Sequence, residues 1–551
     1  MVDVSRPVPR SYLVLAAAAL AVAYAQYELF YHTQNQYFFQ GLVKAGYGLL
    51  RADWFARTPD PWPAFSGLVE FTQRYLDLRL VYLYFLLLVG VYAFSMIGIV
   101  SQLVPIQRTR ATFVAFVALM VALHSPVFGY IVRLGLRLPM ASSPHHFNVG
   151  RILLLEGIGE KRILGDMLNP GTFGVFLLLS IYLFMRGRPV WAVITSTIAS
   201  LAQPSYVFCS AVLTLTYMVI MMRRGKGWRP AIGLGGLALV LILPVLVYSY
   251  LAFRPTSPAL WAEAQNVLWR VAYYPPSVPS LWLGPSVYIK LALIVAALVL
   301  VRKADFFWIL LGTSLTSAVL TVVQDARYNN TLAAILPWRL SAFTVPLATL
   351  VVLGYAVVFF MQRLETSEAV GRAVVTAGVA VLVVLCLAGV TETRIRFGLD
   401  ARRIPTVMRR VRRTRAAGQT YLIPPNWRTF RLYTGAPVFT EHSVIPYDDV
   451  GIMEWYKRLH LAQAFYGEVE ANAEDDFRYR TEGRRTGRAP QEAPTPRPAP
   501  PSPEERCHLL KELATGYGVT HVILRGGGLE GCEGWKTEYA DEHYHLYAVA
   551  K

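Results

Sequence analysis

The sequence predicts a mainly α-helical, polytopic membrane bundle of about 11 transmembrane helices, followed by a small C-terminal α/β domain. Of its 551 residues, 54% are hydrophobic and only 16% are charged, which is too apolar for a soluble chain of this length. The apolar residues form runs, and the lengths of these runs are close to the roughly 20 residues that a membrane span needs. The C-terminal part instead alternates short strand-like and helical stretches.

Eleven apolar runs are the predicted spans, and together with their loops they form the predicted membrane domain, 1–391. They cover residues 11–31, 80–100, 111–132, 172–184, 190–202, 206–222, 231–251, 287–301, 306–323, 336–361 and 374–390. The first run has an alternative interpretation as a signal peptide, because Ala23-Tyr24-Ala25 fits a cleavage site after an apolar stretch that basic residues precede.

Basic residues in the short loops predict the orientation of the chain in its membrane. If the 11 spans alternate, the arginine and lysine clusters of these loops fall on one side, which the positive-inside rule makes the cytoplasm. The N-terminus is then cytoplasmic. The first loop, 32–79, the segments 133–171, 253–286 and 324–330, and the tail are then extracytoplasmic.

A basic amphipathic juxtamembrane segment, 392–419, follows the last span. Residues 402–415 include seven arginines, and apolar residues recur there with helical spacing at Ile404, Val407, Met408 and Val411. This pattern predicts a helix that lies on anionic lipid. Arginines beside a span normally keep a segment in the cytoplasm, so these seven oppose the predicted orientation. The basic clusters of the short loops outweigh them.

The remaining tail, 420–551, is predicted to be an extracytoplasmic α/β domain with a disordered insertion at 470–506, which is rich in proline and charge. Strands are expected at 420–423, 437–440, 519–524 and 545–549, and helices at 450–465 and 504–515. Cys507 and Cys532 would pair in an oxidising compartment, and two free thiols are the alternative.

Asp53, in the first loop, is the leading candidate for a catalytic residue. Arg51, Trp54 and Arg57 surround it, and Asp60 and Glu70 lie in the same loop. A carboxylate among cations can take a proton from an acceptor or hold a divalent metal such as Mg or Mn while the cations bind a phosphate. The alternative is a solvated acid beside an aromatic membrane anchor.

His145 and His146 form a second candidate site, because adjacent histidines can order a phosphate or, as with His146, contribute to a metal site. A structural or solvated role is the alternative. Glu156, Glu160 and Asp166 follow in the same loop as weaker candidates.

Three further arginines are candidate substrate-binding residues. Arg270 lies among aromatic residues and could stack on a sugar ring or simply anchor a helix. Arg327 follows the ninth span and Arg339 lies at the start of the tenth, and both could bind phosphate. An arginine at membrane depth requires an anionic partner, which a lipid phosphate would provide, and snorkelling to the interface is the alternative.

The net charge of +18 is interpreted as topology and contact with the lipid bilayer, and no nucleic-acid partner is expected, because no nucleic-acid-binding motif occurs.

In the order of its motifs the chain resembles the GT-C superfamily of polyprenyl-phosphate-dependent glycosyltransferases, and within it an uncharacterised bacterial group. The motifs are Asn35-Gln36-Tyr37, Asp53-Trp54-Phe55 with Thr58, Pro144-His145-His146, Pro337-Trp338-Arg339 with Ser341, and Ile423-Pro424-Pro425. The resemblance implies a GT-C-like fold, a catalytic acid at Asp53 and a donor phosphate at Arg339 or Arg327. A second acid is also implied, with Asp60, Glu156 and Asp166 as the choices.

The expected function is therefore transfer of a sugar from a polyprenyl-phosphate donor to an extracytoplasmic lipid, glycan or protein. Two alternatives remain: a transporter or flippase of a lipid-linked glycan, and a noncatalytic membrane scaffold.

Overall fold

The structure is a computed structural model of the whole chain. It describes residues 8–9, 11–31, 33–125, 151–268, 282–327, 335–364, 367–467, 501–526 and 528–550. The chain divides into two compact units, and each is described by itself. Unit 1 comprises Met1–Tyr27, Val81–Leu246 and Pro276–Phe397, and unit 2 comprises Glu28–Leu80, Val247–Pro275 and Gly398–Lys551.

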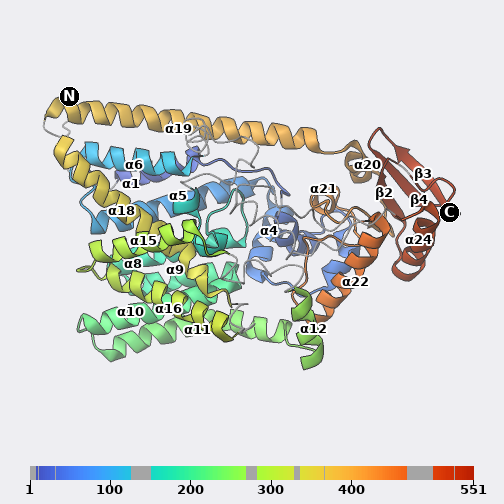
Figure 1. Cartoon of the computed structure of the whole chain (residues 1–551), viewed down its shortest axis with the longest axis horizontal. Helices are drawn as coiled ribbons and strands as arrows, with labels where there is room; N and C mark the ends of the chain where they lie inside the picture. Colours follow the sequence, from blue (N-terminus) through green and yellow to red (C-terminus); the bar gives the residue numbers. More distant parts are fainter. Residues whose placement is uncertain are drawn as a thin grey trace. The chain divides into compact units, whose positions relative to one another are not determined.

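Unit 1 is a bundle of apolar helices that run side by side (Figure 1). Its main helices, some of which extend a few residues into the other unit, are α1 (Ser11–Ala23), α5 (Leu80–Leu103), α6 (Arg110–His124), α8 (Val175–Met185), α9 (Pro189–Ala202), α10 (Val207–Arg223), α11 (Trp228–Ala252), α15 (Pro285–Leu300), α16 (Phe306–Arg327), α18 (Ser341–Leu364) and α19 (Glu368–Arg403). Short helical turns join or precede several of them: η3 (Arg151–Leu155), η4 (Ile158–Glu160), η5 (Pro170–Gly174), η6 (Pro204–Tyr206) and η8 (Pro337–Leu340).

Each predicted span overlaps one of these helices, which confirms a mainly helical chain with a set of apolar helices. Six are long and apolar enough to cross a membrane, and five more are apolar but shorter. Large side chains such as Val240 on α11 and Leu387 on α19 are exposed, as expected of helix faces that meet lipid. The number of spans stays a prediction.

Unit 2 contains a four-stranded sheet. Its strands β1 (Tyr421–Leu422), β2 (His521–Arg525), β3 (Trp535–Ala540) and β4 (Tyr544–Val549) lie in the order β1-β2-β4-β3. β1 is parallel to β2, and the other pairs are antiparallel. The helices of the unit are α2 (Gln34–Tyr37), α3 (Phe39–Lys44), η1 (Leu50–Ala52), η2 (Trp54–Arg57), α4 (Pro63–Tyr75), α12 (Pro258–Leu268), α20 (Thr406–Thr414), α21 (Phe430–Thr434), α22 (Asp449–Tyr466) and α24 (Pro503–Tyr517).

Alternate residues of β2 bury two different cores, as the two-residue period of a strand requires. Val522 and Leu524 pack in one core with residues of α22 and α24. Ile523 packs in the other, with residues of α20 and α21. The small C-terminal sheet that the sequence predicts is therefore present, with helices on both faces.

Three details of the predicted tail differ from the structure. The segment 437–440 is not a strand and makes only an isolated bridge between Tyr421 and Val438. β3 was not expected, because it is a polar edge strand with little burial. The predicted insertion ends earlier than expected, since α24 begins at Pro503; residues 468–500 lie outside the described part.

The basic segment 402–415 also differs from its prediction. The helix α19 continues to Arg403, and α20 begins only at Thr406, after a break that contains Pro405. The apolar stripe of Val407, Met408 and Val411 is buried in the core of unit 2, so it does not face lipid. The pattern correctly indicates an amphipathic helix, but the partner of its apolar face is the sheet.

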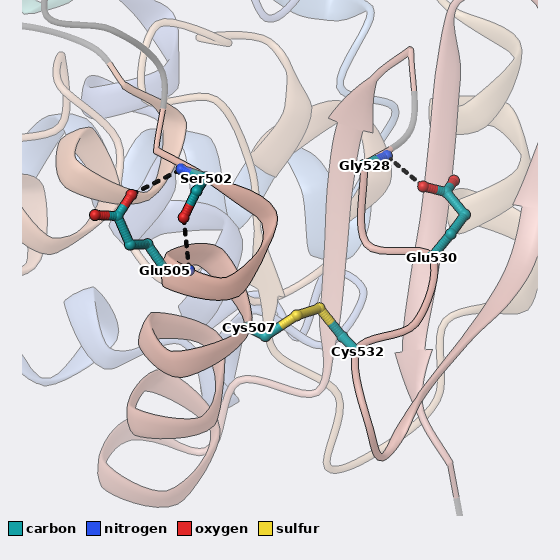
Figure 2. Close-up of a disulfide and its surroundings, with 6 residues drawn as sticks. All are labelled: Ser502, Glu505, Cys507, Gly528, Glu530 and Cys532. Atoms are coloured by element: carbon teal, nitrogen blue, oxygen red, sulfur yellow. Dashed lines mark hydrogen bonds between the residues drawn. A yellow bond between two sulfur atoms is a disulfide. The ribbon is translucent and has the colours of Figure 1, made fainter.

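Cys507 on α24 and Cys532 form a disulfide, with their Cα atoms 5.4 Å apart, which confirms the predicted pairing (Figure 2). Ser502 and Glu505 form a reciprocal cap at the start of α24: the Ser502 hydroxyl accepts from Glu505 N at 3.2 Å, and Glu505 Oε2 accepts from Ser502 N at 2.7 Å. The bridge thus joins a well-capped helix to the loop after β2.

Replacing Cys507 by Ser is expected to destabilise unit 2 by about 3–4 kcal/mol, because the bridge closes a loop and restricts the unfolded chain. The sequence separation of the two cysteines is 25 residues. Pulse proteolysis of the full-length protein in urea measures the change. The free cysteine Cys386 gives the matched control Cys386→Ser. Equal urea midpoints for the two variants would contradict the prediction.

Candidate functional site

Asp53 lies inside unit 2, and backbone groups hold both of its carboxylate oxygens. It precedes the turn η2, where Oδ1 accepts a hydrogen bond from Phe55 N at 3.0 Å and so caps the turn. Oδ2 accepts from Val438 N, in the tail, at 2.9 Å. Only 1% of Asp53 is exposed. The residue thus joins the first loop to a segment far along the chain.

Arg431, on α21, is the cation beside Asp53. Its Nε lies 3.1 Å from Asp53 Oδ2, and its guanidinium lies over the rings of Phe39 and Phe55, at 5.4 and 5.8 Å. The side chain is completely buried. The contact with Asp53 is an ion pair without hydrogen-bond geometry, and neither Nη atom has a hydrogen-bond partner in the described part of the chain.

Glu441 completes the group, which we call the Asp53 cluster: Asp53, Arg431 and Glu441. Its Oε2 lies 3.6 Å from Arg431 Nε, and its side chain is completely buried. Neither of its oxygens finds a hydrogen-bond donor among the residues described. One buried guanidinium therefore faces two buried carboxyl groups and can balance the charge of only one.

The two carboxyl groups differ in their protonation. Burial raises the pKa of Glu441 to about 8, although Arg431 opposes the shift, and the charge of Asp53 raises it further. Burial also raises the pKa of Asp53, but Arg431 and the N–H groups of Val438 and Phe55 counteract the rise. We therefore assign the negative charge to Asp53 and the proton to Glu441 at neutral pH.

Other contacts inside unit 2 hold its three chain segments together. Gln36 Nε2 donates to Ile445 O at 2.9 Å, and Leu49 N donates to Gly435 O at 2.7 Å. From the segment 247–275, Tyr248 Oη donates to Asp60 O at 2.7 Å, and Thr256 N donates to Asp449 Oδ2, also at 2.7 Å. The first loop, this segment and the tail consequently fold as one unit.

The other acids and cations of the first loop lie apart from the cluster. Arg51 and Arg57 are exposed. Asp60 is buried but is held by Lys44 at 2.7 Å and by Ser66 Oγ at 3.0 Å. Glu70 pairs with Arg74 at 2.9 Å. The cation that accompanies Asp53 is therefore a tail residue and not one of its sequence neighbours.

The remaining predicted residues lie in unit 1 or outside the described part. Arg339 is half-buried in η8, and Arg327 is the last residue of α16. Glu156 is largely buried and lies 3.7 Å from Arg162. His145, His146 and Arg270 lie outside the described residues.

The surroundings of Asp53 do not fit a divalent metal. Its oxygens accept from two backbone N–H groups, and the guanidinium beside them would repel a cation. Over the described ranges, no three His, Cys, Asp or Glu residues are grouped as metal ligands.

Sequence reasoning missed Arg431 and Glu441. The available signal was local: Arg431 lies within Phe430-Arg431-Leu432-Tyr433, and Glu441 directly follows the apolar segment 437–440. A charged residue within or beside an apolar run indicates a buried charge, but it does not identify the partner.

Comparison with known proteins gives one family match. Residues 402–462 match a domain of unknown function, DUF6798. The matched segment contains α20, β1, α21 and most of α22, and with them Arg431 and Glu441. No curated protein matches the chain.

Proposed function

We propose that this chain is a membrane-embedded glycosyltransferase that moves a sugar from a polyprenyl-phosphate donor to an acceptor on the extracytoplasmic face of a bacterial inner membrane. The observation that carries the proposal is the Asp53 cluster. Buried charges with unsatisfied polar atoms are costly and are concentrated at functional sites. Here they surround the acid that the resemblance implies is catalytic.

In the proposed reaction, an acceptor hydroxyl attacks the anomeric carbon of the donor. The new bond joins that carbon to the acceptor oxygen, and the bond to the phosphate oxygen breaks. The acceptor proton passes to Asp53, and the polyprenyl phosphate leaves with the bonding electron pair. Arg339 and Arg327 would bind the phosphate, and His145 and His146 would order the donor.

The hydrogen bonds of the Asp53 carboxylate have to change before this mechanism can operate. Both oxygens of Asp53 accept backbone hydrogen bonds, so Oδ2 must leave Val438 N before it can take a proton. Arg431 would then keep the carboxylate ionised, because an adjacent cation favours the charged form.

The chain segments that make up unit 2 support the proposed extracytoplasmic position of this unit. Three segments that fold into one unit lie on the same side of a membrane, and the first loop, 247–275 and the tail are such segments. The disulfide between Cys507 and Cys532 favours an oxidising compartment for this unit.

Asp53→Asn is expected to reduce sugar transfer at least about 100-fold in reconstituted vesicles, because general-base catalysis contributes about 10²–10⁴-fold. Asp77→Asn is the matched control, since Asp77 is an exposed aspartate of the same loop and lies outside the cluster. Radiolabelled sugar transferred to the acceptor is the readout. If Asp53→Asn retained transfer while the fold was intact, the catalytic assignment would be wrong.

A noncatalytic scaffold is the second candidate, and the burial of Asp53 favours it. In that case the carboxylate serves only to hold the first loop to the tail. Asp53→Asn would then reduce function in proportion to the loss of folded protein, and stabilising conditions would restore it. A catalytic base would not be restored in this way.

A further inference from the structure

The outer face of α20 carries four arginines, which we call the α20 patch: Arg409, Arg410, Arg412 and Arg413. All four side chains are exposed, and they lie within two turns of one helix. Like charges that are three or four residues apart are neighbours on a helix surface and repel each other. The patch therefore has an electrostatic cost, and α20 itself contains no acidic residue to offset it.

The surroundings of the α20 patch in unit 2 do not neutralise it. The guanidinium of Arg412 lies over the ring of Tyr433, at 5.1 Å, and meets no carboxylate there. The carboxylate of Asp541 accepts instead from Tyr539 Oη at 2.9 Å and from two backbone N–H groups of its own turn. Within the described ranges, none of the four arginines forms an ion pair. The patch is thus open to an anionic partner.

A lipid surface is not the partner that the structure favours. A helix that lies on a membrane inserts its apolar face, but Val407, Met408 and Val411 are buried in the core of unit 2. The last predicted span ends at Val390, and α19 continues from there as a helix to Arg403. This extension is about 20 Å long, whereas the headgroup layer is about 5–8 Å thick. Salt screens exposed charges beyond about 8–10 Å.

A folded protein is also a poor match for the α20 patch. Protein interfaces have a desolvated centre that is rich in aromatic and apolar residues and poor in charge. The outer face of α20 offers no such anchor, because the apolar side chains of this helix all lie in the core. A hydrophilic polymer with repeated anionic groups needs no apolar contact. Its carboxylate or phosphate groups match the planar fork of a guanidinium.

We propose that the α20 patch binds a glycan that carries acidic groups. Each arginine would contact one carboxylate or phosphate of the polymer, and linking these groups in one chain makes several weak contacts act together. The patch shares no residue with the Asp53 cluster, so binding does not require sugar transfer. Only the further step, that such a glycan is the acceptor, rests on the proposed function.

The test is equilibrium binding to the full-length protein in detergent micelles, with a fluorescent oligogalacturonate as the probe. Its methyl ester keeps the sugar chain without the charge and is expected to bind at least about tenfold more weakly. An oligoglutamate with the same number of carboxylates is also expected to bind about tenfold more weakly, because its flexible side chains lose more entropy than carboxylates attached to a sugar ring. Added salt should weaken binding of the oligogalacturonate.

The double variant Arg410→Gln/Arg413→Gln is expected to weaken binding of the oligogalacturonate about tenfold, because each exposed ion pair contributes at most about fivefold. Both side chains are exposed, so the variant should fold normally. The matched control Lys457→Gln/Lys511→Gln removes two exposed cations from α22 and α24, which pack on the other side of β2. This control should bind as the wild type does.

Four results would overturn the inference. Equal binding of the methyl ester would exclude recognition of the acidic groups. Binding of the oligoglutamate as tightly as the oligogalacturonate would indicate an acidic protein segment, and displacement of the probe by anionic phospholipid would indicate a membrane surface. Equal affinities of the two double variants would indicate general attraction to a chain with a net charge of +18.

Asp53→Asn should bind the oligogalacturonate normally, because Asp53 lies outside the α20 patch. Binding is thus measured separately from sugar transfer, so a failure of this site and a failure of the proposed function are distinguishable.

Discussion

Replacing Arg431 by Met is expected to lower the free energy of unfolding of unit 2 by about 3–5 kcal/mol, because removing one partner of a buried ion pair leaves an uncompensated charge. Arg431 is completely buried, with Asp53 at 3.1 Å and Glu441 at 3.6 Å. The variant removes the cation that lies between the two carboxyl groups. Pulse proteolysis of the full-length protein across a urea series measures the loss.

Arg409→Met provides the matched control. Arg409 is an exposed arginine on α20 of the same unit, and the same substitution there should change stability by no more than about 0.5 kcal/mol. If Arg431→Met were as stable as this control, Arg431 would not be the buried counterion of Asp53.

Glu441→Gln is expected to remove the fall in the stability of unit 2 that accompanies a rise in pH towards 8. The pKa of Glu441 rises from 4.5 to about 8 on burial, so between these values the folded state holds a proton that the unfolded state has lost. The stabilisation of unit 2 by this proton is fully present below pH 4.5. It is lost as the pH rises towards 8, by up to about 1.4 kcal/mol per pH unit. A glutamine cannot ionise, so the variant should be the more stable protein at pH 8.

The measurement is the urea midpoint of unit 2 at a series of pH values from 5 to about 8.5, a window that spans the raised pKa. Glu512→Gln, an exposed glutamate on α24, controls for the loss of a carboxyl group. A wild-type midpoint that does not fall as the pH rises would contradict the assignment of the proton to Glu441.

The helices of unit 1 are predictable from hydropathy, because the need for about 20 apolar residues acts on each span separately. Patterns within short stretches of sequence likewise predict α22, α24 and three of the four strands. The sequence leaves two alternatives for Cys507 and Cys532, a disulfide or two free thiols, and the structure shows the disulfide. The sequence contains these features within short windows.

The Asp53 cluster was not predictable in this way, although Asp53 itself was singled out. Its hydrogen bond to Val438 spans 385 positions of the chain. No pattern in a single sequence shows that two such distant residues are in contact. Proximity in the sequence instead indicated Arg51 and Arg57 as the cations beside Asp53. Arg431 is identified only when the tail and the first loop fold together.

The amphipathic helix α20 shows a related limit. The spacing of Val407, Met408 and Val411 indicates that one face is buried, and it does so equally for a lipid surface and for a protein core. β3 was missed for a similar reason, because its pairing with β4 and not its own polar sequence places it in the sheet.

The most direct test of the account is a double-mutant cycle between Asp53→Asn and Arg431→Met in the full-length protein. The double variant is expected to be more stable than the sum of the single losses implies, with a coupling energy of about 2 kcal/mol, because the two charges are removed together. Additivity within about 0.5 kcal/mol would contradict it. Asp53 and Arg431 would then not be partners, and the first loop would not be tied to the tail through this ion pair.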